Sequence, residues 1–224
     1  MYDYEPKSPD IGALSERELR LQRLADCLES QLTAELILRC LESLAAALDK
    51  LHNRGYVCLN LSPETVWIGI SGIATLTADC PITPRAAFAY PEPELWNLPK
   101  SRAYAAPEVI CFHGEYLERK RMSRIGHRAD VYSLGLVLCK YLFGIGDMTE
   151  TEKRRLLSLL TRQLQRELLS EAFQKLPDTD IEELRKLLRE MLIPVSTVRT
   201  VSLEKVICSL RRIRTSLREK EKTG

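Results

Sequence analysis

One stretch constrains the fold more than any other: residues 130–143 run DVYSLGLVLCKYLF and are apolar on nearly every side. A helix with this composition has no face suited to water, so other elements must surround it. With 224 residues, the chain is long enough to bury such a helix within one large domain. The sequence therefore predicts a buried helix that opens at Asp130.

Another helix is predicted to begin near Thr33 and to end at Gly55. Its apolar residues recur at spacings of four, three, four and three, which places them on one face: Ile37, Leu41, Leu44, Leu48 and Leu51. Thr33 is a suitable residue for the start of a helix, and glycine commonly ends one in the left-handed conformation. The pattern predicts one continuous apolar face on this helix.

Four more helices are predicted from capping residues and apolar periodicity. Ser15 and Glu18 form a capping box that opens a helix over residues 15–30. Amphipathic patterns predict three later helices, over residues 151–173, 180–192 and 202–218. The last two have Asp180 and Ser202 as their expected caps.

Short strands and irregular segments complete the predicted organisation. Extended pieces are expected at residues 57–59, 66–70 and 73–78, followed by an irregular, proline-rich segment over 79–108. The expected parts are a flexible arm over 1–13, one domain over 14–218 and a frayed tail over 219–224. The predicted fold class is mainly α-helical, with short β-strand pairs.

Charge and cysteine content limit the expected partners and location. The 33 basic and 31 acidic residues leave a net charge of +2, so no global charge attracts nucleic acid or a membrane surface. The three histidines are too far apart in sequence to suggest a zinc site. Seven dispersed cysteines, with no C-x-x-C pair and no signal peptide, predict reduced thiols in an intracellular, cytoplasmic protein.

Residues 51–65, LHNRGYVCLNLSPET, resemble the segment that leads into the catalytic loop of protein kinases. That loop carries H-R-D-x-x-x-x-N, whose Asp accepts the substrate hydroxyl proton and whose Asn holds magnesium. The positions that match H, R, D and N in this chain are, in order, Cys58, Leu59, Asn60 and Thr65. Ser62 stands where serine/threonine kinases usually have a Lys. Because an amide is no base near neutral pH and threonine is a poor metal ligand, the resemblance implies a retained loop without its chemistry.

Three further segments resemble kinase motifs in the family's order: YAAPE at 104–108, HRADVYSLG at 127–135 and VRTVSLE at 198–204. Together with the loop they resemble a kinase C-terminal lobe over residues 33–215. The resemblance implies an ion pair between Glu108 and Arg199. It also implies that Asp130 accepts backbone N–H groups from the loop at Cys58–Asn60. Both contacts would stabilise structure rather than perform chemistry.

The parts of a kinase that bind metal and nucleotide are altered or missing in the sequence. The magnesium-binding D-F-G motif should fall within residues 77–81, with either Asp79 or Ala78 at the position of its Asp, and neither register gives a normal metal site. Residues 1–32 hold no G-x-G-x-x-G loop and no V-A-I-K-like strand, so no N-lobe is expected. The resemblance thus implies no catalysis, no metal and no cofactor.

A C-lobe without an N-lobe resembles the kinase non-catalytic C-lobe (KIND) domain, a module that binds short peptide segments. A pseudokinase eroded independently stays an equal alternative, because the loop keeps Leu61, Pro63 and Glu64. Either one implies protein partners, bound through a peptide segment or an acidic surface, and no membrane. The candidate binding residues are a basic group and one indole: Arg119, Lys120, Arg121, Arg124 and Trp96. Two other functions stay open: a phosphotransferase fragment whose N-lobe is supplied elsewhere, and a basic-loop nucleic-acid binder.

Overall fold

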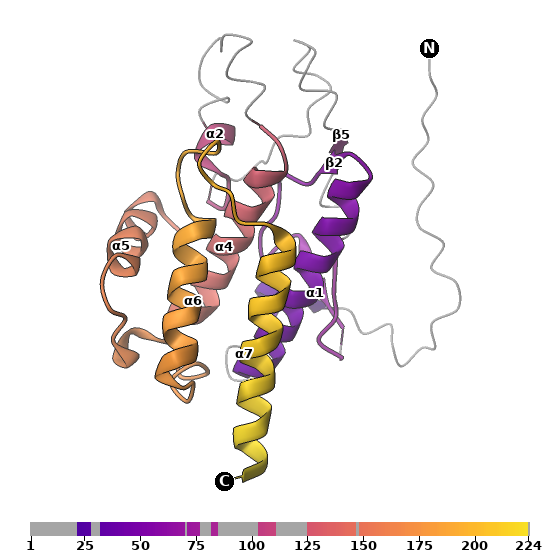
Figure 1. Ribbon diagram of the computed structural model, residues 1–224. Coiled ribbons are helices and arrows are strands. Elements are labelled where there is room, and N and C mark those ends of the chain that lie inside the picture. The colour runs from indigo at the N-terminus through magenta and orange to yellow at the C-terminus, as the bar shows by residue number, and fades with distance from the viewer. Residues whose placement is uncertain are drawn as a thin grey trace, which may run out of the picture.

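The computed structural model describes residues 22–27, 32–69, 71–76, 82–84, 103–110, 125–146 and 148–223. In these residues the fold is mainly helical, with two small antiparallel sheets beside the helices (Figure 1). No helix in this part of the chain combines the length and the apolar composition that crossing a membrane requires. The mainly helical class expected from the sequence is confirmed.

Helix α4, His127–Phe143, forms the centre of the fold. Every residue on it from Ala129 to Cys139 is buried, and helices α1 and α6 both contact it. The helix ends at Gly144, whose φ of 62° is the left-handed conformation that glycine adopts without strain. The predicted all-round burial is confirmed, although the helix begins at His127 rather than at Asp130.

Helices α1, Ala34–Asn53, and α7, Leu203–Thr223, run side by side (Figure 1). The Thr33 hydroxyl accepts the Leu36 N–H at 3.2 Å, so the first turn of α1 is capped as expected. Glu42 of α1 joins the two helices, because its carboxylate accepts from Arg211 at 2.7 Å and from Arg214 at 3.0 Å. The helix predicted from Thr33 to Gly55 is confirmed.

Three more helices lie in the part of the chain that the structure describes. Helix α6, Asp178–Met191, contacts α4, α7 and α5, and α5 covers Glu150–Leu160. The short α2, Pro107–Ile110, lies at the end of the molecule where α4 begins (Figure 1). Ser202 accepts the Lys205 N–H at 3.2 Å, which caps α7 as the sequence predicted.

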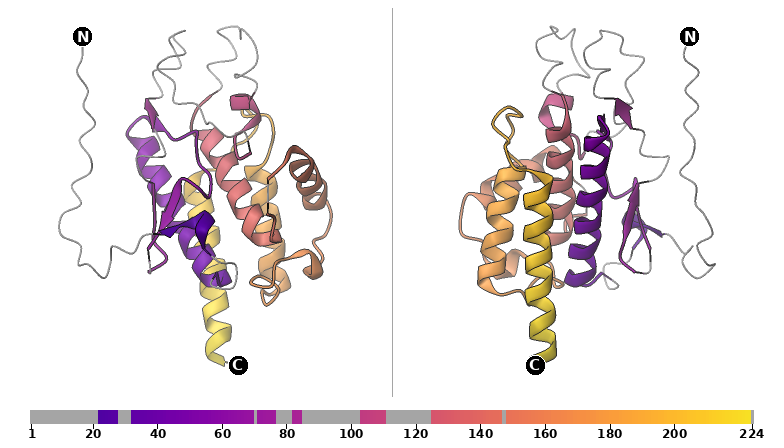
Figure 2. Two further views of the ribbon diagram at one scale, coloured as in Figure 1. Left: turned by 180° about the vertical axis from the view of Figure 1, so that it is seen from behind. Right: turned by 45° about the vertical axis from the view of Figure 1, so that its right-hand side comes forward.

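The strands pair in two small sheets. In the first, β3 (Val66–Ile68) pairs antiparallel with both β1 (Gln22–Arg23) and β4 (Ala74–Leu76). In the second, β2 (Tyr56–Val57) pairs with β5 (Thr83–Pro84). The first sheet lies on the far side of α1 from α6 (Figure 2, right). Strands thus flank the segment that joins β2 to β3, which contains the kinase-like loop.

The helix predicted over residues 15–30 is wrong where the chain is described. Residues 22–27 form strand β1 and a short 3₁₀ turn, Leu24–Asp26. Tertiary contacts override the capping pattern: Leu24 is buried, its carbonyl accepts the Tyr141 hydroxyl at 3.0 Å, and the Ala25 N–H donates to the Pro63 carbonyl at 3.0 Å. The Arg23 guanidinium also lies 5.5 Å from the centre of the Trp67 ring. The rest of the predicted helix lies outside the described residues.

The helix predicted over residues 151–173 is wrong beyond residue 160. There α5 ends, and a 3₁₀ turn, Arg166–Leu168, and further turns follow. The apolar residues that suggested a longer helix, such as Phe173, are buried by this irregular backbone instead. The Arg166 guanidinium stabilises the turns because it donates to the carbonyl groups of Gln174 and Leu176.

Two other helix ends also differ from the prediction. Asp180 does not cap α6, because its own N–H and that of Ile181 already donate to the Pro177 carbonyl at 3.0 Å, which closes a helical turn ahead of it. Helix α7 extends to Thr223, so residues 219–223 continue the helix where a frayed tail was expected. The predicted arm over 1–13 lies outside the described residues.

The close packing of α4 against the end of α6 gives a testable prediction at Gly135. A Cβ at this position would lie 3.1 Å from the Cβ of Met191 and 3.0 Å from a methyl group of Leu192. Gly135→Ala should therefore lower the free energy of unfolding by about 1–3 kcal/mol, despite the better helix propensity of alanine. Urea denaturation measures the change.

Gly146→Ala is the matched control, because no atom lies within 4 Å of the added methyl group. This variant should unfold within about 0.5 kcal/mol of the parent protein. Equal stability of the two variants would contradict the packing of α4 against Met191 and Leu192.

Candidate functional site

Asp130, on the first turn of α4, accepts hydrogen bonds from the segment that resembles the kinase catalytic loop. Asp130 has no exposed surface. One of its carboxylate oxygens accepts the Cys58 N–H at 2.8 Å, and the other accepts the Leu59 N–H at 2.7 Å. The structure thus brings Asp130 to the loop positions that the resemblance implied.

The backbone of the loop turns sharply between Cys58 and Asn60. Leu59 has a φ of 55°, a left-handed conformation that residues other than glycine rarely adopt, and its side chain is buried. The Asn60 N–H donates back to the Cys58 carbonyl at 2.7 Å. The two hydrogen bonds to Asp130 stabilise this unfavourable turn, which presents Asn60 half-buried beyond it.

Two histidines also meet at Asp130. His52 Nε2 lies 2.8 Å from the Asp130 carboxylate, and the His52 ring stacks on that of His127 with centroids 4.2 Å apart and planes 8° from parallel. No local sequence pattern predicts this cluster, because the two residues are far apart in the chain. The only signal was that one histidine ends α1 and the other begins the motif that contains Asp130. His52 completes a set of three donors around one buried carboxylate.

Thr65, at the position of the kinase metal ligand, uses its hydroxyl to close the loop. The hydroxyl oxygen accepts the Ser62 N–H at 3.0 Å and lies 2.8 Å from the Asn60 carbonyl oxygen, to which it donates. The Ser62 side chain is buried beside it, with its oxygen 3.5 Å away. Since a hydroxyl has one proton and two lone pairs, most of its bonding capacity is used within the loop. In the described residues, no group of three or more His, Cys, Asp or Glu could hold a metal ion.

The expectation that all seven cysteines are reduced is wrong at Cys58. This residue is disulfide-bonded. Dispersed spacing in the sequence gives no information on which cysteines the fold brings together. The other described cysteines, at positions 27, 40, 139 and 208, are free thiols. Burial raises the pKa of the Cys40 thiol to about 12 and raises that of Cys139 further, so neither is a reactive thiolate near neutral pH.

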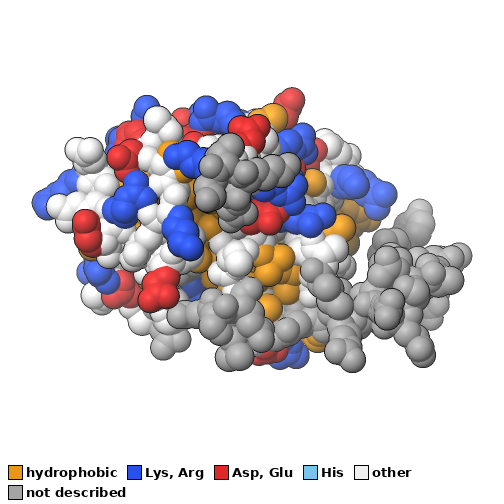
Figure 3. All heavy atoms as spheres, turned by 90° about the horizontal axis from the view of Figure 1, so that it is seen from below, with side chains coloured by type: hydrophobic (Ala, Val, Ile, Leu, Met, Phe, Trp, Pro, Cys, Tyr) orange, Lys and Arg blue, Asp and Glu red, His pale blue; other side chains and the backbone are white. Residues whose placement is uncertain are grey.

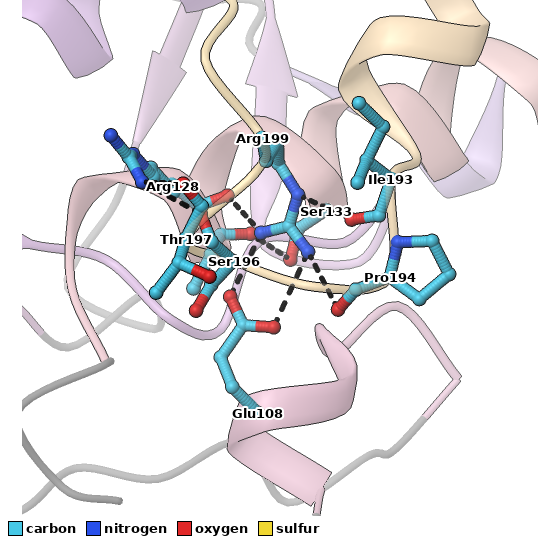
Figure 4. Close-up of polar contacts among 9 residues, drawn as sticks. Glu108, Arg128, Ser133, Ile193, Pro194, Ser196, Thr197 and Arg199 are labelled. Atoms are coloured by element: carbon cyan, nitrogen blue, oxygen red, sulfur yellow. Dashed lines mark hydrogen bonds and ion pairs between the residues drawn. The ribbon is translucent and has the colours of Figure 1, made fainter.

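Glu108 and Arg199 form a buried ion pair, and Figure 4 shows them facing each other. The Arg199 guanidinium donates to the two Glu108 oxygens at 2.8 and 3.3 Å, and it is fully buried. It also donates to the carbonyl groups of Ile193, at 2.9 Å, and Arg128, at 2.6 Å. Arg199 thereby connects α2, the start of α4 and the turn after α6.

Aromatic packing covers the same guanidinium. Its central carbon lies 4.7 Å from the centre of the Tyr132 ring. Burial raises the pKa of the Tyr132 hydroxyl to about 12, against an opposing effect of the nearby Arg199 charge. Tyr132 is therefore neutral at physiological pH and acts here as a packing surface for Arg199.

Arg128 makes a second set of contacts to the same turn, and the sequence analysis did not identify it. Its guanidinium donates to the carbonyl groups of Ser196, at 2.8 Å, and Thr197, at 2.9 Å (Figure 4). Two arginines thus stabilise the turn over residues 193–199: Arg199, which belongs to the turn, and Arg128, at the start of α4. The turn carries two exposed apolar side chains, Val195 and Val198.

Asp79, at one register of the altered D-F-G motif, lies outside the described residues. So do the proposed partner-binding residues: Arg119, Lys120, Arg121, Arg124 and Trp96. The structure therefore shows the two expected structural contacts, of Asp130 with the loop and of Glu108 with Arg199. The expected binding surface stays a prediction.

Comparisons with known proteins find no match: no protein-family model fits the chain, and no curated protein resembles it in sequence.

The buried Glu108–Arg199 pair predicts that replacing the Glu108 carboxylate by an amide lowers the stability of the fold strongly. Glu108→Gln removes the negative charge and leaves the Arg199 guanidinium buried without a counter-ion. The free energy of unfolding should fall by about 3–5 kcal/mol, measured by urea denaturation.

Glu190→Gln makes the same chemical change in an ion pair with Lys205 in which both side chains are largely exposed. It should cost at most about 1 kcal/mol. If the two variants lost equal stability, Glu108 and Arg199 would not form a structural pair.

Proposed function

We propose that this chain is a kinase C-lobe-like module that lacks phosphoryl transfer and acts by binding other proteins. The proposal rests on the resemblance of four sequence motifs to those of the kinase family. The contacts that such motifs make for structural reasons support it, namely Asp130 with the loop and Glu108 with Arg199. It includes both a KIND-like domain and a pseudokinase.

The single observation that carries the loss of chemistry is that the Thr65 hydroxyl bonds within the loop, beside an amide at Asn60. Asn60 stands where a kinase needs a base, and an amide cannot take up a proton near neutral pH. The Thr65 hydroxyl, at the metal-binding position, bonds to the Ser62 N–H and the Asn60 carbonyl. The loop is therefore stabilised by contacts among its own groups, where phosphoryl transfer needs groups directed at metal and substrate.

A scaffold role agrees with the placement of buried charge. Asp130 and Arg199 are fully buried, and both use their hydrogen-bonding groups to join segments distant in sequence. Buried charges with several partners stabilise a defined arrangement of segments. A rigid surface of this kind suits the recognition of a protein segment without any chemical step.

The basic side chains of α7 do not favour the alternative of nucleic-acid binding. Arg211 and Arg214 pair with Glu42, Arg212 with Glu183 and Arg218 with Glu35. On the end of the molecule seen in Figure 3, Asp and Glu side chains are interspersed among the Lys and Arg side chains. Phosphate binding would have to compete with these ion pairs, so α7 is a poor electrostatic surface for a nucleic acid.

The proposal predicts no response to nucleotide in a thermal-unfolding experiment. A ligand at 100 times its Kd adds about 2.7 kcal/mol of stability. For a domain of this size, each kcal/mol raises Tm by about 2–4 °C, so a bound nucleotide should raise Tm by at least about 5 °C. With saturating ATP and magnesium, we expect no rise in Tm.

An active protein kinase, measured in the same plate, provides the positive control for nucleotide and metal. A clear rise in Tm for this chain would contradict the proposal and favour the phosphotransferase alternative. Asn60→Asp tests the same point further: it restores only the carboxylate, so it should not produce transfer of phosphate to a general protein substrate.

A further inference from the structure

A groove of about 420 Å³ lies between the chain that leaves α5 and the outer side of α6. Residues 161–164 line one side of it. Five residues of α6 line the other side, among them Arg185 and Arg189, one helical turn apart. The buried side chains of Leu164 and Ile181 contribute apolar wall, so the groove combines charged and apolar surface.

Both acidic residues of the groove already have basic partners. Asp178 accepts from Arg166 at 2.5 Å. Glu182 accepts from the Arg185 Nε at 2.7 Å, and Arg185 also donates to the Leu160 carbonyl at 2.9 Å. Arg185 is thus held in place by the last turn of α5 and by Glu182, and the acidic groups are neutralised within the fold.

Two arginines of the groove remain available. In the described part of the chain, neither the Arg162 nor the Arg189 side chain forms a hydrogen bond or an ion pair, and both side chains are exposed. They stand on opposite sides of the groove, Arg162 beyond the end of α5 and Arg189 on α6. The groove therefore has two unpaired cationic side chains, whereas each of its two acidic side chains has a basic partner.

The electrostatics of Glu182 report the same excess of positive charge. Its pKa is lowered chiefly by the hydrogen bond from Arg185; burial opposes this, and the charges of Arg185, Lys186 and Arg189 add smaller lowering effects. Lys186 and Arg189 therefore lie close enough to act on the groove, although neither forms an ion pair with Glu182.

We propose that this groove binds an acidic peptide segment of a partner protein. The inference rests on the proposed protein-binding function and names one surface for it. Guanidinium groups bind carboxylates through paired N–H donors, and separated arginines match carboxylates spaced along an extended peptide. The apolar wall at Leu164 and Ile181 would receive an aliphatic side chain between them.

The test measures binding of a fluorescein-labelled peptide of alternating glutamate and leucine by fluorescence polarisation. The parent protein should bind it and should not bind the same peptide with glutamine in place of glutamate. The double variant Arg162→Glu/Arg189→Glu should weaken binding by at least about tenfold, which corresponds to about 1.4 kcal/mol. Arg162→Gln/Arg189→Gln should give an intermediate loss, since it removes the charges without reversing them.

The matched control is Arg54→Glu/Arg154→Glu, which makes the same change in net charge at two exposed arginines outside the groove. This variant should keep the affinity of the parent protein within about twofold. Three outcomes would overturn the inference: no binding of the peptide, equal losses in the groove and control variants, or tighter binding of a single-stranded oligonucleotide than of the peptide. None of these outcomes depends on nucleotide, so the ATP experiment tests the proposed function separately.

Discussion

The buried carboxylate of Asp130 is the interaction on which the rest of the site depends. A carboxylate without solvent contact is unfavourable unless hydrogen bonds surround it, and here His52 and the N–H groups of Cys58 and Leu59 do so. These donors come from the end of α1 and from the segment that leads from β2 toward β3. Asp130 on α4 therefore sets the positions of the end of α1, the left-handed turn at Leu59 and the loop that follows. The Ala25 N–H donates to the Pro63 carbonyl of that loop, so residues 22–27 pack against it.

This loop has hydrogen bonds that stabilise its shape, but it lacks the side chains that phosphoryl transfer needs. Hydrogen bonds stabilise its backbone. At the positions that the resemblance assigns to a kinase base and metal ligand, Asn60 cannot accept a proton near neutral pH and the Thr65 hydroxyl bonds within the loop. The Glu108–Arg199 pair has the same character, because all its partners are structural. These contacts agree with the proposed binding function, for which the groove at Arg162 and Arg189 is the candidate surface.

Sequence patterns predicted the elements in which local preference and burial agree. The apolar stretch of α4 and the apolar face of α1 could be predicted, because in each the local apolar pattern and the burial in the fold both favour a helix. The segment at 22–27 could not, since its capping box competes with pairing to β3 and with burial of Leu24, both of which depend on distant residues. The stacking of His52 on His127, the disulfide at Cys58 and the role of Arg128 likewise join positions that no local pattern relates.

Native-state amide hydrogen exchange at Cys58 and Leu59 tests the central claim most directly, because each N–H donates to one oxygen of Asp130. If Asp130 holds the loop, both amides should open with free energies close to that of core amides of α4 such as Val137. In Asp130→Asn this protection should fall well below that of Val137. Opening free energies near zero in the parent protein, as in mobile loops, would contradict the account.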